Sequence, residues 1–288
     1  MKEEKNKLMW VDGELIPWAS ATVPIATHAL HYASSVFEGI RSYDGYVFKM
    51  HEHYQRFHES SRGIGFDLPY SIKELEEATE EVVQRENCND LYIRSLAWCG
   101  SNKMTVASRG IDVHVAIMAW ERPLIRNHSA VRLIQSRWRR PDPCTAPVHS
   151  KASGLYMIST MSKNEAEIQG YDDALLLDYR GYIAEASSSN FFVVKDSRLI
   201  TPIPHSCLNG ITRLTIIALA KTLGIPVEER DFELKDLEGA TEAFLTGTAI
   251  EILSIGEIQC NQGRFVFKEE AIINRLKQAF YQLTNQIN

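Results

Sequence analysis

Thr145-Ala-Pro-Val-His-Ser-Lys-Ala-Ser-Gly-Leu-Tyr156 is the stretch around which the rest of this chain can be arranged. Its lysine, Lys151, has small and apolar neighbours, whereas most lysines of the chain have charged residues beside them in sequence. A lysine that loses hydration in such a setting is freed as a nucleophile towards carbonyl groups. An ordinary lysine at the exit of a loop fits the same residues. The sequence around Lys151 leaves both interpretations open.

Length, charge and cysteine usage bound the class of protein. The chain has 288 residues, which is long enough for two domains with a core each. Its formal net charge of −6 gives no basic surplus for displacing phosphate counterions, which argues against nucleic-acid binding. Five scattered cysteines without a Cys-x-x-Cys pair indicate a reduced compartment and neither zinc nor a disulfide framework. The charged N-terminus lacks an apolar run, and no segment has the length of a membrane span. We therefore expect a soluble, cytoplasmic protein without a metal site.

The first 120 residues are expected to form a smaller domain of mixed helices and strands. Asp-Gly pairs at 12–13 and 44–45 predict hairpins between short strands. Helices are expected at 51–62 and, after the capping box Ser71-Ile-Lys-Glu74, to about residue 86. Strands are expected at 91–99 and 111–120. Residues 121–130 lose periodicity and contain a proline, so we place an interdomain loop there.

Residues 131–288 are expected to form a larger domain in which strands and helices alternate. Strands are predicted at 131–138, 173–178, 182–185, 190–194, 226–230, 243–246 and 250–258. Helices are predicted at 153–169, 209–224 and 268–286, with a short helix near 235. The mixture of elements in both halves favours α/β layers.

Two turns rich in small residues are candidate ligand sites. Asn209-Gly-Ile-Thr212 leads directly into a long helix, whose free amides and dipole attract anions, although a plain helix cap has the same pattern. Thr246-Gly-Thr-Ala249 lies between two apolar strands and allows close approach of a ligand, as would a simple hairpin. Glu185 ends a short apolar strand; if it is buried, it needs a cationic partner.

Three histidines lie on the helix expected at 51–62. His51, His53 and His58 lack the spacing of a His-Glu-x-x-His zinc motif, so we interpret them as solvated helix positions. The chain contains neither a Gly-x-x-x-x-Gly-Lys-Ser/Thr motif nor a Gly-x-Gly-x-x-Gly motif after a strand, which argues against the nucleotide-binding folds that use them.

Together these pieces resemble the branched-chain aminotransferases of the fold-type IV class, which depend on pyridoxal 5′-phosphate (PLP). The likeness spans nearly the whole chain. It is carried by His28-Ala-Leu-His-Tyr-Ala-Ser-Ser-Val-Phe-Glu-Gly-Ile-Arg41, Tyr92-Ile-Arg94, Ser150-Lys-Ala-Ser-Gly-Leu-Tyr156, Gly181-Tyr-Ile-Ala-Glu-Ala186, Gly210-Ile-Thr-Arg213 and Thr246-Gly-Thr-Ala-Ile-Glu251. The resemblance implies a mixed α/β fold of two domains, of the D-amino acid aminotransferase type, in which 131–288 is the PLP-binding domain.

The resemblance also implies a role for each matched residue near the cofactor. Lys151 would form the internal Schiff base with PLP and shuttle a proton between Cα and C4′. Glu185 would pair with the pyridinium nitrogen, and Tyr156 would hydrogen-bond the 3′-oxygen. Arg56 would bind the phosphate. The other implied cofactor-binding residues are Leu208, Gly210, Ile211, Thr212 and Thr248.

For the substrate, the resemblance implies an apolar pocket with one cation. Its residues would be Tyr32, Phe37, Gly39, Tyr92, Arg94, Met104 and Trp120. The backbone amides of Thr248 and Ala249 would hold the α-carboxylate, and Arg94 would bind the distal carboxylate of glutamate.

The implied reaction is transfer of the amino group from L-leucine, L-isoleucine or L-valine to 2-oxoglutarate, by a ping-pong cycle through pyridoxamine phosphate. The family's active sites lie between two domains and receive a loop from a neighbouring subunit, so a homodimer or a dimer-based hexamer is implied. Alternatives of the same fold are a D-amino acid aminotransferase, an R-selective amine transaminase and an aminodeoxychorismate lyase. A metabolite-binding protein without catalysis, with Lys151 as a structural cation, is an alternative of another class.

The sequence departs from the family pattern at four places. Asn209 and Ser95 stand where proline is usual, which barely affects the expected fold. Trp120-Glu-Arg-Pro123 lacks an aromatic that many relatives carry after the tryptophan, and Ile250 replaces a usual alanine. The last two departures touch the implied substrate pocket.

Overall fold

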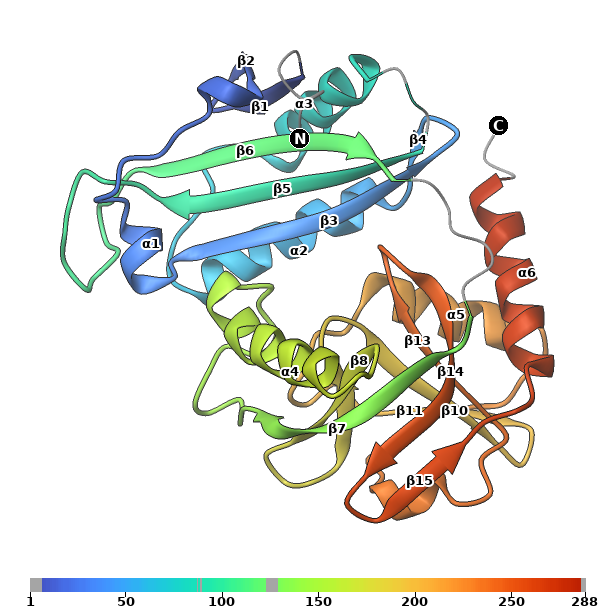
Figure 1. The fold of residues 1–288 in the computed structure, drawn as a ribbon. Coiled ribbons are helices and arrows are strands. Elements are labelled where there is room, and N and C mark those ends of the chain that lie inside the picture. Colours follow the sequence, from blue (N-terminus) through green and yellow to red (C-terminus); the bar gives the residue numbers. More distant parts are fainter. Residues whose placement is uncertain (1–6, 87, 89, 123–128, 286–288) are drawn as a thin grey trace. The chain divides into compact units, whose positions relative to one another are not determined.

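The computed structural model describes residues 7–86, 88, 90–122 and 129–285 (Figure 1). The chain divides into two compact units, one of Met1–Leu124 with Ser150–Leu155, the other of Ile125–His149 with Tyr156–Asn288. Within the described ranges, no helix is long and apolar enough to cross a membrane.

The first unit is built on an antiparallel sheet of six strands in the order β2-β1-β6-β5-β3-β4. The strands are β1 (Leu8–Val11), β2 (Glu14–Pro17), β3 (Ser35–Tyr43), β4 (Tyr46–Val47), β5 (Leu91–Cys99) and β6 (Val113–Glu121). Both predicted hairpins are present, between β1 and β2 and between β3 and β4. Their Asp-Gly pairs have positive φ, at 49° and 99° for Asp12 and Gly13, which is the conformation that favours these residues in tight turns.

Two helices cover one face of this sheet, α2 (Met50–Gly63) and α3 (Ile72–Gln84) (Figure 1). Between helices and sheet lies a core that includes Ile40, Tyr54, Phe57 and Ile93, all fully buried. The predicted capping box opens α3, since Ser71 Oγ accepts from the backbone N of Glu74 and the Glu74 carboxylate accepts from the backbone N of Ser71. The short helices η2 (Trp18–Ser20) and α1 (His28–Tyr32) were not predicted.

The second unit contains a sheet of nine strands, six of which close into a barrel. The strands are β7 (Val131–Arg140), β8 (Asp173–Asp178), β9 (Ile183–Ala186), β10 (Asn190–Lys195), β11 (Arg198–Thr201), β12 (Val227–Glu229), β13 (Glu242–Gly247), β14 (Glu251–Cys260) and β15 (Gly263–Val266). The order β10-β13-β14-β7-β8-β9 returns to β10 because β9 pairs with both β8 and β10. Strands β11 and β12 extend the sheet beyond β10, and β15 pairs with β14. Closure leaves the six barrel strands without free edges.

Alternation along the barrel strands separates the core from an outer row of polar residues. Phe191 and Leu245 belong to the main apolar core, so their neighbours Asn190 and Thr246 point to the other face. Asn190 is the cross-strand partner of both Thr246 and Glu185. Glu185, Asn190 and Thr246 therefore form a row across β9, β10 and β13.

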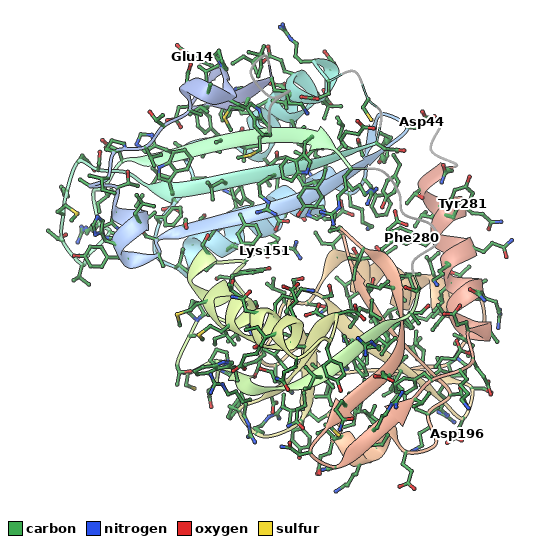
Figure 2. All side chains as sticks on the ribbon, viewed as in Figure 1. Glu14, Asp44, Lys151, Asp196, Phe280 and Tyr281 are labelled. Atoms are coloured by element: carbon green, nitrogen blue, oxygen red, sulfur yellow. The ribbon has the colours of Figure 1, made fainter. Side chains whose placement is uncertain are left out.

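The helices of the second unit are α4 (Tyr156–Ile168), α5 (Ile211–Thr222), α6 (Ala271–Asn285) and the short η4 (Leu234–Leu237). On α6, Phe280 is buried whereas its neighbour Tyr281 is exposed (Figure 2). The start of α6 is attached to the sheet by Glu242 of β13, whose carboxylate accepts from the backbone N of Ile272 and of Ile273 at 2.9 and 2.8 Å.

One segment departs from the predicted division of the chain. Residues 150–155, with the short helix η3 (Ser153–Leu155), were placed with 131–288 but belong to the first unit. The reason is backbone pairing: Ala152 bridges to Val36 of β3, and the backbone N of Phe37 donates to the carbonyl of Lys151 at 3.1 Å. Of the interdomain loop expected at 121–130, residues 123–128 lie outside the described part of the chain.

Candidate active site

The backbone of Lys151, whose side chain is labelled in Figure 2, is held by a hydrogen bond on each side. Its carbonyl accepts from Phe37 of β3, and its backbone N donates to Ser60 Oγ of α2 at 2.9 Å. The segment lies so close to α2 that a Cβ on Gly63 would stand 2.2 Å from Ser150 Oγ. The Lys151 amine lies 4.9 Å from the centre of the Phe37 ring. These contacts hold the lysine along β3 with its amine directed over an aromatic ring.

Five of the predicted substrate residues gather on the sheet face that carries Phe37. Gly39 is the cross-strand partner of Arg94, and Tyr92 is that of Trp120. The Arg94 guanidinium lies 4.6 Å from the Phe37 ring and donates from Nη2 to the Tyr92 hydroxyl at 3.1 Å. The Tyr92 and Trp120 rings are 5.0 Å apart. A Cβ on Gly39 would stand 2.1 Å from the Tyr92 hydroxyl, so glycine provides the room that this ring needs.

Arg94 combines aromatic contacts with an unsatisfied donor. Its Nε is buried and has no hydrogen-bond partner among the described residues. A buried guanidinium N–H without an acceptor is costly unless a ligand satisfies it. Arg94 is therefore suited to bind a carboxylate brought by a ligand.

Tyr32 and Met104 lie in another, exposed part of the first unit. Tyr32 ends α1, where its ring contacts that of His28 at 4.7 Å, and its side chain is 43% exposed. Met104 is in the loop between β5 and β6 and is 51% exposed. His28 joins these two segments, since its ring bonds the carbonyl of Thr105 at 2.8 Å. The structure does not bring Tyr32 and Met104 into the aromatic group around Arg94.

On the opposite sheet face, Arg56 is held by a buried carboxylate. Glu38 is fully buried and accepts from Arg56 Nε and Nη2 at 2.7 and 2.8 Å, and from His53 Nδ1 at 2.7 Å. Burial alone would raise the pKa of Glu38, but the Arg56 charge and the His53 hydrogen bond outweigh it and hold this pKa well below its usual range. An ionised Glu38 only accepts, so His53 Nδ1 is the donor.

His53 corrects one prediction. The interpretation of the α2 histidines as solvated holds for the exposed His51 but is wrong for His53, which is 1% exposed. Burial, together with the charges of Arg56 and Lys151, lowers the pKa of His53 despite its bond to Glu38, so the ring is neutral near pH 7. The sequence carried a signal for this cluster: an acidic residue interrupts the apolar run at 36–40, and residues 53 and 56 share one helix face.

In the second unit, the candidate carboxylate Glu185 is buried and has the cationic partner that burial requires. Arg140 of β7 lies 3.1 Å from Glu185 Oε1, and both residues are less than 9% exposed. The prediction of a cationic partner is confirmed, although the sequence did not identify Arg140. Beside the pair, burial and then the Glu185 charge raise the pKa of Cys207 well above its usual value, which keeps this thiol protonated.

The turn before α5 begins the helix without a side-chain cap. Gly210 is the N-cap and gives no side-chain hydrogen bond, so the amides of Ile211 and Thr212 open the helix without help from it. Asn209, which stands where the family has proline, accepts from Arg213 Nη1 at 2.8 Å. The fully buried Arg213 also binds the carbonyl of Pro202 and the carboxylate of Glu229. The turn is thus anchored from inside the unit by Arg213.

The second small-residue turn is the hairpin between β13 and β14. The backbone N of Ile250 donates to the carbonyl of Gly247 at 3.1 Å, and Thr246 Oγ1 donates to the carbonyl of Glu251 at 2.7 Å. Thr248 and Ala249 between them are half-buried. Tyr156, at the start of α4, is half-buried as well.

Asn190 connects several of these segments, because its Nδ2 donates to the carbonyl of Leu208 at 2.9 Å and its backbone pairs with Glu185 and Thr246.

Comparisons with known proteins identify the family. Residues 35–258 match the model of the family described as Amino-transferase class IV. A relative from Rickettsia felis, "Probable branched-chain-amino-acid aminotransferase", is 41% identical over 278 residues, which cover 96% of each chain. The chain belongs to the class IV aminotransferases. The predicted resemblance and the predicted α/β fold of fold type IV are confirmed.

Solved structures agree with this membership. The class IV aminotransferase chain matches the T.th. branched-chain amino acid aminotransferase with pyridoxamine 5′-phosphate at a TM-score of 0.92 and 34% identity, covering 98% of this chain and 95% of that one. It matches the branched-chain aminotransferase from Thermoproteus uzoniensis with norvaline at a TM-score of 0.91 and 36% identity, covering 96% and 94%. The T.th. enzyme is also known in complexes with N-(5′-phosphopyridoxyl)-L-glutamate and with 4-methylvaleric acid.

Proposed function

We propose that this protein is a PLP-dependent branched-chain aminotransferase. It exchanges the amino group between L-leucine, L-isoleucine or L-valine and 2-oxoglutarate, in a ping-pong cycle through pyridoxamine phosphate. Family membership and the names of its relatives support the aminotransferase class. The observation that carries the proposal is the fixation of Lys151 by Phe37 and Ser60, which holds one lysine amine over an aromatic ring.

The residues of the second unit fit PLP. A helix that starts without a side-chain cap offers the amides of Ile211 and Thr212 to a phosphate. The Thr248 hydroxyl and the Arg56 guanidinium of the first unit are further donors of the kind that phosphate needs. Glu185 supplies a carboxylate for the pyridine nitrogen, and Tyr156 a hydroxyl for the ring oxygen.

PLP, when bound, withdraws electrons from the substrate's Cα and makes its proton acidic. With PLP bound, the Lys151 amine would take this proton from Cα and would return it at C4′ of the cofactor. Phe37 lies against this amine and helps to keep water away from it. The Glu185 carboxylate, held by Arg140, keeps the pyridine nitrogen protonated.

The face around Arg94 offers a site for both kinds of substrate. The Phe37, Tyr92 and Trp120 rings form an apolar surface that suits a branched aliphatic side chain. The unsatisfied Nε of Arg94 suits the distal carboxylate of glutamate. The T.th. complexes parallel this pairing, since 4-methylvaleric acid has a branched apolar chain and the glutamate adduct carries a distal carboxylate. The backbone amides of Thr248 and Ala249 are the proposed site for the α-carboxylate.

A homodimer, or a hexamer built from dimers, completes the proposal. The first unit exposes large apolar side chains on neighbouring segments: Ile25, Leu30, Tyr32, Met104 and Val106. Hydrogen bonds connect these segments. The His31 ring bonds the carbonyl of Ile25, and the His28 ring bonds the carbonyl of Thr105. Such a group of exposed apolar residues favours burial against another subunit.

Half-reactions followed through the cofactor's absorbance test the proposal. The purified protein is expected to be coloured, to lose its visible band in Lys151→Ala, and to react with L-leucine, L-isoleucine, L-valine and L-glutamate. Reaction with D-alanine alone, or with aminodeoxychorismate alone, would transfer the assignment to another enzyme of this fold. A protein that binds no PLP would instead support a metabolite-binding role.

A further inference from the structure

Asn190 joins three segments of the second unit that carry proposed cofactor contacts. As the first residue of β10, it is the cross-strand partner of Glu185 on β9 and of Thr246 on β13. Its side chain reaches the turn before α5, where Nδ2 donates to the carbonyl of Leu208 at 2.9 Å. Asn190 is 7% exposed, so this hydrogen bond is shielded from water.

The other end of the carboxamide packs against the same turn. A Cβ built on Gly210 would stand 2.2 Å from Asn190 Oδ1, which is closer than any real contact. Asn190 therefore fills the space that a side chain at position 210 would need. Because Nδ2 is bonded to Leu208, Oδ1 cannot move away without breaking that bond. The carboxamide thus fixes the turn from Leu208 to Gly210 through two atoms.

Asparagine also suits the electrostatics of this place. The start of α5 carries the positive end of a helix dipole and is the proposed phosphate site. A neutral amide supplies a donor to Leu208 without adding negative charge. An aspartate of the same shape would lose the donor and place an anion beside the phosphate.

We propose that Asn190 is a positioning residue that holds the 208–212 turn in register with Glu185. Its backbone belongs to the strand pair that carries Glu185, and its side chain holds the turn that receives the phosphate. The protein site for the phosphate and the protein site for the pyridine nitrogen are thereby kept at a fixed separation. This inference rests on the proposed function, because it takes PLP as the ligand.

Titration of the apoprotein with PLP and with pyridoxal, which lacks the phosphate, tests the inference. In Asn190→Ala we expect PLP affinity to fall about tenfold, which corresponds to about 1.4 kcal/mol. Asn190→Asp should weaken it further because of charge repulsion. The affinity for pyridoxal should change by less than about twofold, since the Glu185 side of the site is untouched. The ratio of the two affinities is a measurement that general destabilisation does not move.

Thr201→Val is the matched structural control. Thr201 is fully buried and its Oγ1 donates to the carbonyl of Phe191, next to Asn190 on β10, at 2.8 Å. This variant removes a buried side-chain bond to the same strand without touching the turn, so Tm should fall while the PLP-to-pyridoxal ratio stays that of the wild type. Equal losses for both ligands in Asn190→Ala, or no loss, would overturn the inference. A wild-type apoprotein that binds neither ligand would instead overturn the proposed function.

Gly210→Ala tests whether the turn is held through Asn190. The added Cβ must displace the carboxamide, so PLP binding should weaken in the single variant. In the Asn190→Ala background the same change should cost less than about twofold, because the obstruction is gone. Losses that add fully in the double variant would show that the two residues act independently, and the inference would fail.

Discussion

Arg94 is placed between rings yet keeps a donor unsatisfied. Stacking over Phe37 and the bond to Tyr92 hold its guanidinium plane, while Nε has no acceptor among the described residues. A fixed guanidinium next to apolar rings can recognise a carboxylate without excluding an aliphatic side chain. Such a surface suits the two ligands of different polarity that the proposed function requires.

We expect Arg94→Ala to lower kcat/KM for glutamate about tenfold or more, and to affect leucine much less. Arg94→Lys is the matched variant, since it keeps the charge but loses the planar fork. Its kcat/KM for glutamate should lie between those of the wild type and of Arg94→Ala. Rates of the two half-reactions, measured separately by stopped-flow absorbance, decide this. Equal losses for leucine and glutamate would contradict the assigned role of Arg94.

Glu185→Gln keeps the shape of the side chain and removes its charge. We expect this variant to retain PLP but to lose turnover by about 100-fold or more, because a neutral amide does not keep the pyridine nitrogen protonated. Cofactor content by absorbance and turnover with leucine are the measurements. Turnover close to that of the wild type would refute the role of Glu185.

Glu38→Gln removes the buried anion that accepts hydrogen bonds from Arg56 and His53. We expect the free energy of unfolding near pH 7 to fall by about 3 kcal/mol. Because the folded pKa of Glu38 is depressed, its contribution is present above the ordinary value of 4.5 and is lost as pH falls towards the folded pKa. The difference between wild type and variant should therefore shrink below pH 4.5.

Urea unfolding at several pH values measures this difference. Glu77→Gln is the control, since Glu77 forms an exposed ion pair with Lys73 at 3.6 Å and should contribute little. A Glu38→Gln variant as stable as Glu77→Gln would contradict the role given to this carboxylate.

For single residues, the sequence predicted what kind of partner a side chain needs better than which residue is that partner. Glu185 was correctly expected to need a cation, but Arg140 was not identified, since a partner 45 residues away depends on how β7 and β9 are placed in the barrel. His53 was misjudged because helix periodicity does not reveal that Glu38 lies beneath it. A local charge pattern shows that a side chain needs a partner of opposite charge or a hydrogen bond. Which residue provides it depends on the tertiary fold.

Long elements with strong periodicity were predicted closely, and short ones were not. Strands β5 and β8 have the predicted bounds, and α2 and α3 differ by about two residues. The four-residue strands β11 and β15 and the five-residue helix α1 were missed because they are too short for a period to be visible. Barrel closure was not predicted either, since it depends on β9 pairing on both edges.

The first turn of α6 is bound to the sheet by one carboxylate. Glu242 accepts from two amides at the helix start, as an N-cap does, although it comes from a strand distant in sequence. We expect Glu242→Ala to lower the free energy of unfolding by about 2 kcal/mol. Glu242→Gln retains an acceptor oxygen and should lose less. Chemical denaturation measures both, and an unchanged Glu242→Ala would show that α6 is held by other contacts.

For the whole molecule, the exposed apolar residues predict self-association. A chain of 32.7 kDa should sediment as a dimer or a multiple of it. Ile25→Asp combined with Val106→Asp, at positions 84% and 79% exposed, should shift it towards the monomer. Ile168→Asp, at an 85% exposed position of the second unit, is the matched control. Analytical ultracentrifugation decides, and a wild-type monomer at micromolar concentration would refute the proposed assembly.

The residence of 150–155 in the first unit has a consequence for engineering by recombination. The polypeptide passes between its units after residue 122 and before residue 129, and again at 149–150 and 155–156. A chimaera spliced at the first passage would give Lys151 a foreign β3 edge and a foreign Ser60. An exchange of halves between homologues should therefore transplant the hexapeptide Ser150–Leu155 together with the N-terminal part. Lys151 is encoded in the second half of the gene, but the residues that position it are encoded in the first half.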